Sequence, residues 1–250
     1  MQIIAVANQK GGCAKTTTTA NLGVCLAELG KKVLLIDNDP QGNLSSNLGV
    51  KEYENTLYNC ILNKLPIQDA IIKTQFDVDV VPSDINYSNA EGALYNVKRK
   101  EFLIKDLFDR SGLNYDYVLI DCSPSLSLTT VNALVCASSV LIPLEASIFN
   151  FQGLGQLVNV LKAVISNYNS DLKVEGILLT RVDTRSNLGK NFGEQLKEIF
   201  GDKLFETAIH QSTSLVRSQM RQQPISYYDR NSKGYKEYMR LAQEVIKRGN

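Results

Sequence analysis

Residues 8–19 read Asn8-Gln9-Lys10-Gly11-Gly12-Cys13-Ala14-Lys15-Thr16-Thr17-Thr18-Thr19. This stretch follows an apolar run, residues 3–7, that predicts a β-strand, and it leads into residues 15–30, which predict a helix. A strand, a glycine-bearing loop and a helix N-terminus together form a phosphate cradle, because backbone N–H groups and the positive end of the helix dipole face the anion. The stretch therefore predicts a nucleotide phosphate site.

The loop departs from the ordinary phosphate-loop pattern at Gln9 and Ala14, where that pattern has glycine, and it carries an additional lysine, Lys10. Lys15 is expected to reach the β- and γ-phosphates, and the Thr16 hydroxyl to ligate Mg²⁺. The alternative is a strand–helix turn that binds nothing. The expected nucleotide-binding residues are Lys10, Gly11, Gly12, Cys13, Ala14, Lys15, Thr16 and Thr17, the last adding a hydroxyl to the α-phosphate.

Composition points to one α/β domain over residues 1–250, with 44% hydrophobic residues and a net charge of +1. The apolar runs are short, which excludes a membrane-spanning helix, and the first strand leaves no room for a signal peptide, so we expect a cytoplasmic protein. Five cysteines without Cys-x-x-Cys spacing and a single histidine argue against structural zinc. Cys13 is either a filler of the loop or a thiol of lowered pKa at the helix N-terminus.

Apolar runs and helical periodicity alternate along the chain, which predicts a doubly wound, mostly parallel sheet with helices on both faces. No internal repeat or long linker is evident. The expected strands are residues 3–7, 32–36, 77–82, 115–121, 140–144, 174–180 and 204–209. The expected helices are residues 15–30, 101–109, 126–137, 152–165, 192–200, 214–220 and 234–247.

Acidic residues end two of the expected strands: Asp37 and Asp39 follow residues 32–36, and Asp121 closes residues 115–121. Ligands of such sheets bind at the carboxyl ends of the strands, so these aspartates should face the phosphate loop. Asp121 is expected to hold Mg²⁺, Asp37 to support it through water, and Asp39 to orient the attacking water. For Asp37 or Asp39 the alternative is an ordinary helix N-cap.

Three segments resemble the nucleotide boxes of the ParA/MinD ATPases. Residues 10–17 resemble the deviant Walker A box, and residues 115–124 resemble the Walker B segment. Residues 33–43 resemble the Asp-x-Asp-Pro-Gln-Gly-Asn box of the ParA branch. The resemblance covers nearly the whole chain. It implies a P-loop NTPase fold, ATP and Mg²⁺ as cofactors, and a nucleotide-sandwich homodimer in which Lys10 reaches the partner's nucleotide. It further implies slow hydrolysis stimulated by a ParB-type protein, non-specific DNA binding at the nucleoid, and a role in plasmid or chromosome partition without an N-terminal helix-turn-helix domain.

The expected DNA face is basic. Residues 181–250 carry 13 Lys/Arg and 8 Asp/Glu, against 14 and 18 in residues 1–180. The basic Pro-Arg-x-x-Arg segment typical of the family is replaced here by residues 210–214, without arginine. The candidates for phosphate contacts are Arg185, Lys190, Arg217 and Arg221, with Lys247 and Arg248 as further members of the face.

Three other classes share part of this pattern. A MinD-like membrane-positioning ATPase needs a separate basic amphipathic helix at the C-terminus, whereas residues 234–247 have a broad apolar stripe suited to packing on the sheet. An iron-protein-like reductase needs paired cysteines for a cluster, and Cys122 has no evident partner. A binding protein without hydrolysis is disfavoured because Lys10, Lys15 and Asp39 are all present.

Overall fold

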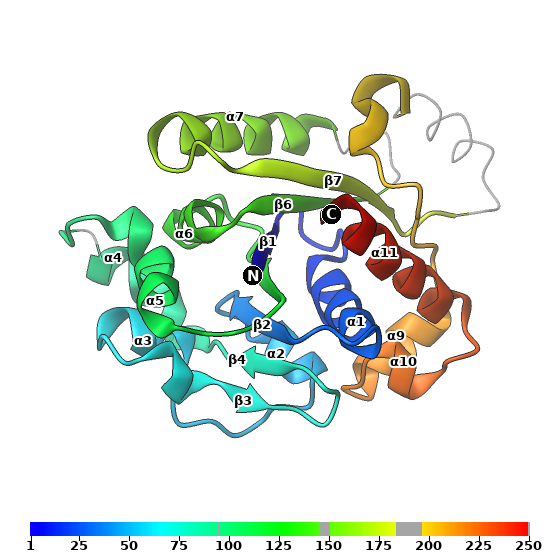
Figure 1. The fold of residues 1–250 in the computed structure, drawn as a ribbon, viewed down its shortest axis with the longest axis horizontal. Coiled ribbons are helices and arrows are strands. Elements are labelled where there is room, and N and C mark those ends of the chain that lie inside the picture. Colours follow the sequence, from blue (N-terminus) through cyan, green and yellow to red (C-terminus); the bar gives the residue numbers. More distant parts are fainter. Residues whose placement is uncertain (95, 146–150, 184–196, 250) are drawn as a thin grey trace.

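The structure is a computed structural model that describes the chain except for residues 95, 146–150, 184–196 and 250. Seven strands of the described residues form one sheet in the order β3-β4-β2-β5-β1-β6-β7. All neighbouring strands pair in parallel, except that β3 runs antiparallel to β4 at one edge. Helices lie on both faces of this sheet (Figure 1), which confirms the predicted doubly wound fold.

The strands are β1 (Gln2–Val6), β2 (Val33–Asn38), β3 (Ile72–Lys73), β4 (Asp79–Val81), β5 (Tyr117–Cys122), β6 (Ser139–Glu145) and β7 (Lys173–Thr180). The α-helices are α1 (Lys15–Glu28), α2 (Asn43–Asn47), α3 (Leu57–Leu62), α4 (Ala90–Leu94), α5 (Leu103–Ser111), α6 (Leu128–Cys136), α7 (Phe151–Asn167), α9 (Thr213–Met220), α10 (Ile225–Tyr228) and α11 (Lys233–Gly249). Short 3₁₀ turns are η1 (Ile67–Ala70), η2 (Ile85–Asn89), η3 (Lys100–Phe102) and η5 (Gly201–Lys203).

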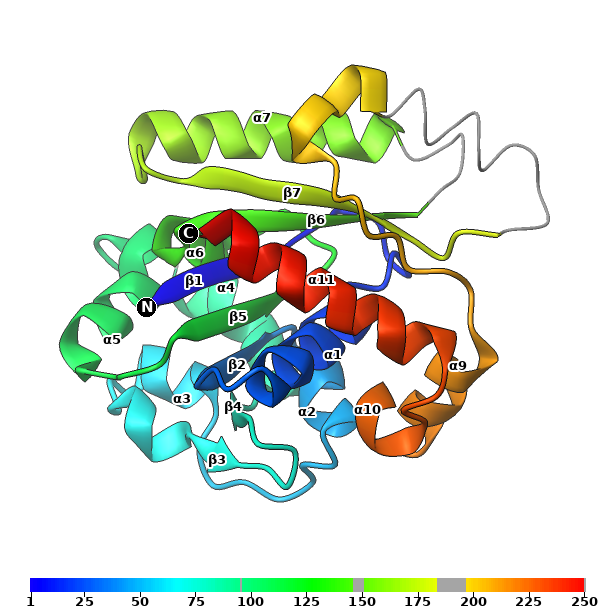
Figure 2. The ribbon, with the colours of Figure 1, turned by 45° about the vertical axis from the view of Figure 1, so that its right-hand side comes forward.

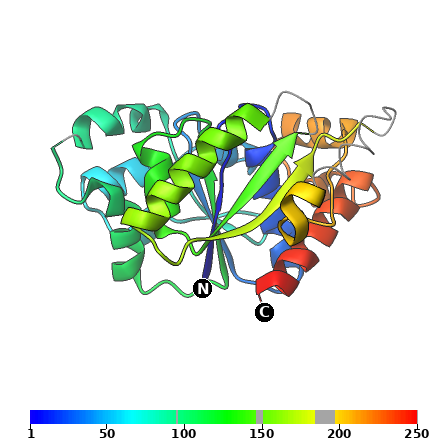
Figure 3. The same cartoon turned by 90° about the horizontal axis from the view of Figure 1, so that it is seen from above.

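The side chains of each central strand alternate between two hydrophobic cores, because successive residues of a strand point to opposite faces. In β1, Ile4 and Val6 join the core beneath α1 and α11, whereas Ile3 and Ala5 join the core beneath α5, α6 and α7. Figure 3, seen from above, shows these helices on the two sides of the sheet. Burial on both faces explains why these strands read as continuous apolar runs.

The C-terminal helix α11 belongs to the core. Its residues Tyr238, Leu241, Ala242 and Val245 are fully buried, and the helix lies beside α1 (Figure 2). The apolar stripe at residues 234–247 thus packs against the body of the molecule, as its breadth predicted. No helix among the described residues combines the length and apolar character needed to cross a membrane.

One predicted strand is wrong. Residues 204–209 run beside β7 but form no strand: an isolated bridge joins Leu204 to Ile177 of β7, and another joins His210 to Val182, just beyond β7. The ladder is interrupted because the amides of Glu206 and Thr207 donate to the Glu244 carboxylate of α11, at 2.9 and 3.1 Å. The seventh strand is instead β3 at the opposite edge. Most of the helix predicted at residues 192–200 lies outside the described residues.

The turn into α1 contains two residues of positive φ, Gly12 at 76° and Ala14 at 69°. Glycine adopts this left-handed conformation freely, but an L-residue with a Cβ pays roughly 1–2 kcal/mol for it. Ala14 stands immediately before Lys15, the first residue of α1. The alanine that departs from the loop pattern is therefore strained, and the strain lies directly beside the residue expected to bind phosphate.

We predict that Ala14→Gly raises the free energy of unfolding. Relief of the left-handed strain is offset in part by the greater freedom of glycine in the unfolded chain, which leaves a gain of about 1 kcal/mol. Urea denaturation measures it. The matched control is Ala27→Gly inside α1, which should cost about 1 kcal/mol because its backbone is helical. A loss of stability in both variants contradicts the strain at Ala14.

Candidate nucleotide-binding site

The expected site residues meet at the carboxyl edge of the sheet because β2, β5 and β1 are neighbours. Asp121 lies in register with Val6 of β1 on one side and with Asp37 of β2 on the other. A cleft of about 1340 Å³ opens above this edge. It is lined by the phosphate loop, by Asp39 and by residues of the segments that follow β5 and β7. The predicted convergence of three strand ends is thus present.

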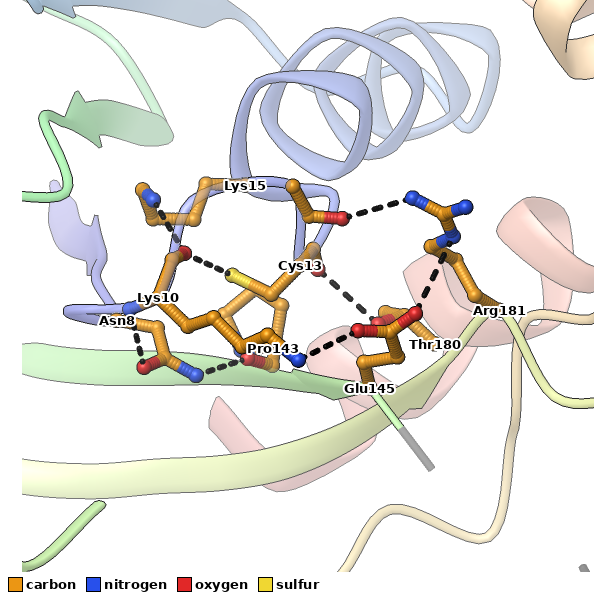
Figure 4. A network of polar contacts seen from close by, with 9 residues as sticks. Asn8, Lys10, Cys13, Lys15, Pro143, Glu145, Thr180 and Arg181 are labelled. Carbon is orange, nitrogen blue, oxygen red and sulfur yellow. Dashed lines mark hydrogen bonds and ion pairs between the residues drawn. The ribbon is translucent and has the colours of Figure 1, made fainter. Parts of the chain in front are cut away.

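The phosphate loop is fastened to the sheet through its carbonyl oxygens (Figure 4). The Thr180 hydroxyl donates to the Cys13 carbonyl at 3.0 Å, and the Arg181 guanidinium donates to the Gly12 carbonyl at 3.3 Å. Below the loop, the Asn8 amide nitrogen donates to the Pro143 carbonyl at 2.7 Å. The bonds from Thr180 and Arg181 engage carbonyl oxygens of the loop, which favours presentation of its N–H groups to an anion.

Lys15 is buried at the start of α1, and its Nζ donates to the Lys10 carbonyl at 3.2 Å. The Cys13 thiol donates to the same oxygen at 3.1 Å. Burial raises the pKa of Cys13 above its ordinary value, although the Lys15 charge opposes this effect. Cys13 is accordingly a buried filler, and the alternative of an activated thiol is wrong.

Asp121 is fully buried, and its Oδ2 accepts no hydrogen bond from the described residues. Its Oδ1 accepts from the Thr19 hydroxyl at 3.4 Å. Burial, followed by the Asp37 carboxylate, raises the pKa of Asp121 well above its ordinary value, while Thr16 and Lys15 lower it. A buried carboxylate oxygen without a donor, close to the hydroxyl of Thr16, fits a hard cation such as Mg²⁺.

Asp37 and Asp39 differ in their positions and in their hydrogen-bond partners. Asp37 is buried and accepts from the Ser45 amide at 2.9 Å and the Ser45 hydroxyl at 2.7 Å, so it fastens the first turn of α2. Asp39 lines the cleft and accepts from the Gln41 amide at 3.0 Å, inside its own turn. The N-cap of α2 is Gly42. Neither aspartate is itself the N-cap, although Asp37 serves α2 in a similar way.

Lys10 forms an ion pair within its own chain: its Nζ lies 2.9 Å from Oε2 of Glu145, at the end of β6. The other carboxylate oxygen of Glu145 lies 3.6 Å from Nε of Arg181 (Figure 4). The Lys10 side chain remains 41% exposed. Glu145 thus lies between two cations at the mouth of the phosphate loop.

Three residues of the site were missed by sequence reasoning: Glu145, Arg181 and Gln219. Glu145 and Arg181 each stand one residue beyond an apolar strand run, at the sheet edge where ligands bind, and this position is a signal that the sequence offers. Gln219 donates to the Thr17 hydroxyl oxygen at 2.6 Å. It is 202 residues away along the chain, and no local pattern marks it.

The expected DNA-contact residues are only partly placed. Arg217 and Arg221 are exposed at the C-terminal end of α9, beside a shallow hollow. Arg185 and Lys190 lie outside the described residues. Arg248 is not part of an open basic face: it donates to the Glu244 carboxylate and the Leu204 carbonyl, both at 2.9 Å, and lies over the Phe205 ring.

A parallel sheet whose first strand leads into a phosphate loop, with aspartates at the ends of neighbouring strands, defines a P-loop nucleotide-binding protein. A family model described as an AAA domain matches residues 1–174. The chain is 41% identical over 251 residues to the sporulation initiation inhibitor protein Soj of Bacillus subtilis, with 99% of each chain covered. It is 38% identical over 253 residues to the chromosome partitioning protein ParA of Caulobacter vibrioides, with 99% of this chain and 95% of that protein covered. The chain belongs to the ParA/Soj family of P-loop ATPases.

A solved structure shares the fold of this chain. Cobyrinic acid a,c-diamide synthase from Mycobacterium smegmatis, with a bound ATP analogue and magnesium, matches with a TM-score of 0.90 and 29% identity. The match covers 100% of this chain and 96% of that one. The family that the three nucleotide boxes indicated is therefore confirmed along the full length of the chain.

We predict that Asp37→Asn stabilises the nucleotide-free protein at pH 7.5. Burial raises the pKa of Asp37 from its ordinary value of 3.8 to about 6, which corresponds to about 3 kcal/mol of lost stability when the carboxylate is charged. The substitution also removes the 3.3 Å hydrogen bond from the Asp39 amide, which costs about 1 kcal/mol. The expected net gain in the free energy of unfolding is therefore about 2 kcal/mol.

The sign of the pH dependence follows from the raised pKa. The native state binds the proton more tightly than the unfolded state, so the wild type loses stability as pH rises from about 4 to about 6. The advantage of Asp37→Asn should shrink as pH falls through this window. Denaturation in EDTA at several pH values checks it, with Asp202→Asn at an exposed position as the control. An advantage that is constant with pH contradicts the assignment.

Proposed function

We propose that this protein is a magnesium-dependent ATPase of DNA partition. The proposal is carried by one observation: Lys10 and Lys15 belong to a single braced loop that faces the aspartates at the ends of β2 and β5. Its family members Soj and ParA support the partition role, and the ATP analogue and magnesium in the M. smegmatis structure support the cofactors.

The loop amides and Lys15 bind the β- and γ-phosphates, and Thr17 donates to the α-phosphate. Thr16 and Asp121 would hold Mg²⁺, and Asp37 would support it through water. The ion would supply positive charge that offsets the charge of the phosphates. Asp39, which lines the cleft, orients the attacking water. The buried Oδ2 of Asp121, which accepts no hydrogen bond from the described residues, supports the assignment of Asp121 to the cation.

Lys10 acts in trans in this proposal. Two copies of the chain pair across their clefts, and Lys10 of each reaches the nucleotide of the other. Hydrolysis is slow until a ParB-type partner stimulates it, because the site is complete only in the dimer. The exposure of the two lysines supports this: the Lys10 side chain is 41% exposed, whereas Lys15 is buried.

The ATP-loaded dimer binds DNA without sequence preference, which places the protein at the nucleoid in the cytoplasm. Arg217 and Arg221 contribute phosphate contacts, together with Arg185 and Lys190, and residues 1–250 act as one domain. The MinD-like alternative gains no support from α11, because its apolar residues lie in the core. For the reductase alternative, burial raises the pKa of Cys122 above its ordinary range, which disfavours a thiolate ligand there.

The two lysines can be separated by mutation. Lys15→Ala is expected to weaken ATP affinity at least about 100-fold, because several charge-assisted hydrogen bonds to phosphate are lost. Lys10→Ala is expected to change ATP affinity less than about threefold and to abolish the ATP-dependent dimer. Fluorescent-nucleotide titration and sedimentation velocity measure the two effects.

Lys51→Ala, an exposed lysine outside the cleft, serves as the control. Asp39→Ala completes the set: it should bind ATP and form the dimer but release phosphate at least about 100-fold more slowly. An equal loss of ATP affinity in Lys10→Ala and Lys15→Ala would contradict the role of Lys10 in trans, and unchanged phosphate release in Asp39→Ala would remove Asp39 from the mechanism.

DNA retention should depend steeply on salt. Each arginine that neutralises one DNA phosphate contributes close to one unit to the slope of log affinity against log salt. The double variant Arg217→Ala/Arg221→Ala should therefore lower the slope by about two per protomer, equally for unrelated DNA sequences. Arg110→Ala on α5, over the opposite face of the sheet, is the control. A slope that stays unchanged excludes this end of α9 from the DNA surface.

A further inference from the structure

Gln219 connects α9 to the phosphate loop. Its amide nitrogen donates to the hydroxyl oxygen of Thr17, in the first turn of α1, at 2.6 Å. Both residues line the nucleotide cleft. Thr17 is the loop residue expected to donate to the α-phosphate, so this contact controls a group that is expected to touch substrate.

The direction of the bond determines what Thr17 can do. A threonine hydroxyl has one proton and can donate only once, but its oxygen can accept as well. Because Gln219 fills the acceptor role of the oxygen, the hydroxyl proton is free to point at another acceptor. Accepting a hydrogen bond also polarises the hydroxyl and strengthens it as a donor. A phosphate oxygen in the cleft is an acceptor that suits this arrangement.

The surroundings hold Gln219 and Thr17 in place. The carbonyl of Thr17 accepts from the Asn21 amide at 2.8 Å, and Asn21 in turn accepts from the Ile225 amide at 2.7 Å. The chain turn after α9 is fixed by a bond from Gln222 to the Ser46 hydroxyl at 3.3 Å, in α2. The C-terminal end of α9 is thus tied to both the Walker A helix and the segment that follows Asp39.

The surface of α9 beside Gln219 is exposed to solvent. Val216, which lines the cleft together with Gln219, and Met220 are 57% and 80% exposed, and Arg217 and Arg221 are exposed next to them. Gln219 lies within two residues of both arginines. The Gln219–Thr17 contact therefore connects the nucleotide cleft to the helix that carries these charges.

We propose that Gln219 is a positioning residue for the nucleotide: it keeps the Thr17 hydroxyl as a donor to a phosphate oxygen. The inference rests on the proposed function, since it assumes that nucleotide phosphate occupies the loop. It adds to that function a residue outside the three nucleotide boxes and ties α9 to nucleotide occupancy.

Two substitutions at Gln219 distinguish positioning from packing. Gln219→Leu removes the donor and should weaken the affinity for ADP and for ATP by about tenfold, to a similar extent for each. Gln219→Glu keeps the shape, but its carboxylate accepts the Thr17 proton and repels phosphate, so the loss should exceed that of the leucine variant. The affinity for adenosine, which has no phosphate, should change less than twofold in both.

A double-mutant cycle supplies the second readout. Thr17→Val removes the same hydroxyl, so Gln219→Leu made in that background should weaken ADP binding less than twofold further. Gln223→Leu, on the adjacent turn and outside the cleft lining, is the control and should bind like the wild type. Isothermal titration of the full-length protein with each ligand measures all variants, and thermal denaturation without nucleotide confirms that they fold.

The inference is overturned if Gln219→Leu binds ADP as tightly as the wild type, if adenosine affinity falls in parallel with ADP affinity, or if the losses in the cycle are additive. A failure of the proposed function is a separate result, because the wild type itself would then bind neither ATP nor ADP. The loss of the Gln219→Leu effect in the Thr17→Val background is the outcome that a purely structural role of Gln219 does not produce.

Discussion

The bonds that hold the carbonyl oxygens of the phosphate loop are the constraint on which the rest of the site depends. A loop that binds an anion must present N–H groups, and it can do so stably only when its carbonyls are satisfied elsewhere. Here Thr180 binds the Cys13 carbonyl, Arg181 binds the Gly12 carbonyl, and Lys15 binds the Lys10 carbonyl. The first two come from β7 and the residue after it, two strands away from β1 in the sheet. The sheet order therefore determines the polarity of the loop.

The threonine run extends this bracing along α1. Thr17 is bound by Gln219 of α9, Thr18 lies 3.4 Å from the Tyr238 hydroxyl of α11, and Thr19 donates to Asp121 of β5. Successive positions of a helix point about 100° apart, so three adjacent hydroxyls reach three different elements. The same region buries two acids, Asp37 and Asp121. Burial raises the pKa of each, which shows that their charged forms are unfavourable there. A bound cation would offset the negative charge of these two buried acids.

The sequence alone was sufficient to predict the site residues that stand at the ends of strands. Asp37, Asp39 and Asp121 were predictable because parallel strands bring their carboxyl ends to one edge. At Ala14 the sequence left a left-handed and a helical backbone both open, because alanine itself does not favour positive φ. The segment at residues 204–209 has the composition of a strand, but the amides of Glu206 and Thr207 donate to Glu244 of α11 instead of to β7. The role of Gln219 could not be predicted from the sequence for the same reason, because it depends on a contact between distant parts of the chain.

The ion pair of Lys10 with Glu145 is compatible with a lysine that works on a second subunit. Both side chains retain contact with water, at 41% and 24% exposure, and exposed pairs of this kind contribute at most about 1 kcal/mol. Release of Lys10 toward a polyphosphate of several negative charges therefore costs little. Arg181 lies on the other oxygen of Glu145, so that carboxylate keeps a cation when Lys10 leaves. A buried pair would have held the lysine far more firmly, because breaking it leaves an uncompensated charge. In the proposed dimer, the exposed position of this pair would allow Lys10 to transfer to the partner's nucleotide, whereas Lys15, which is buried, would stay with its own chain.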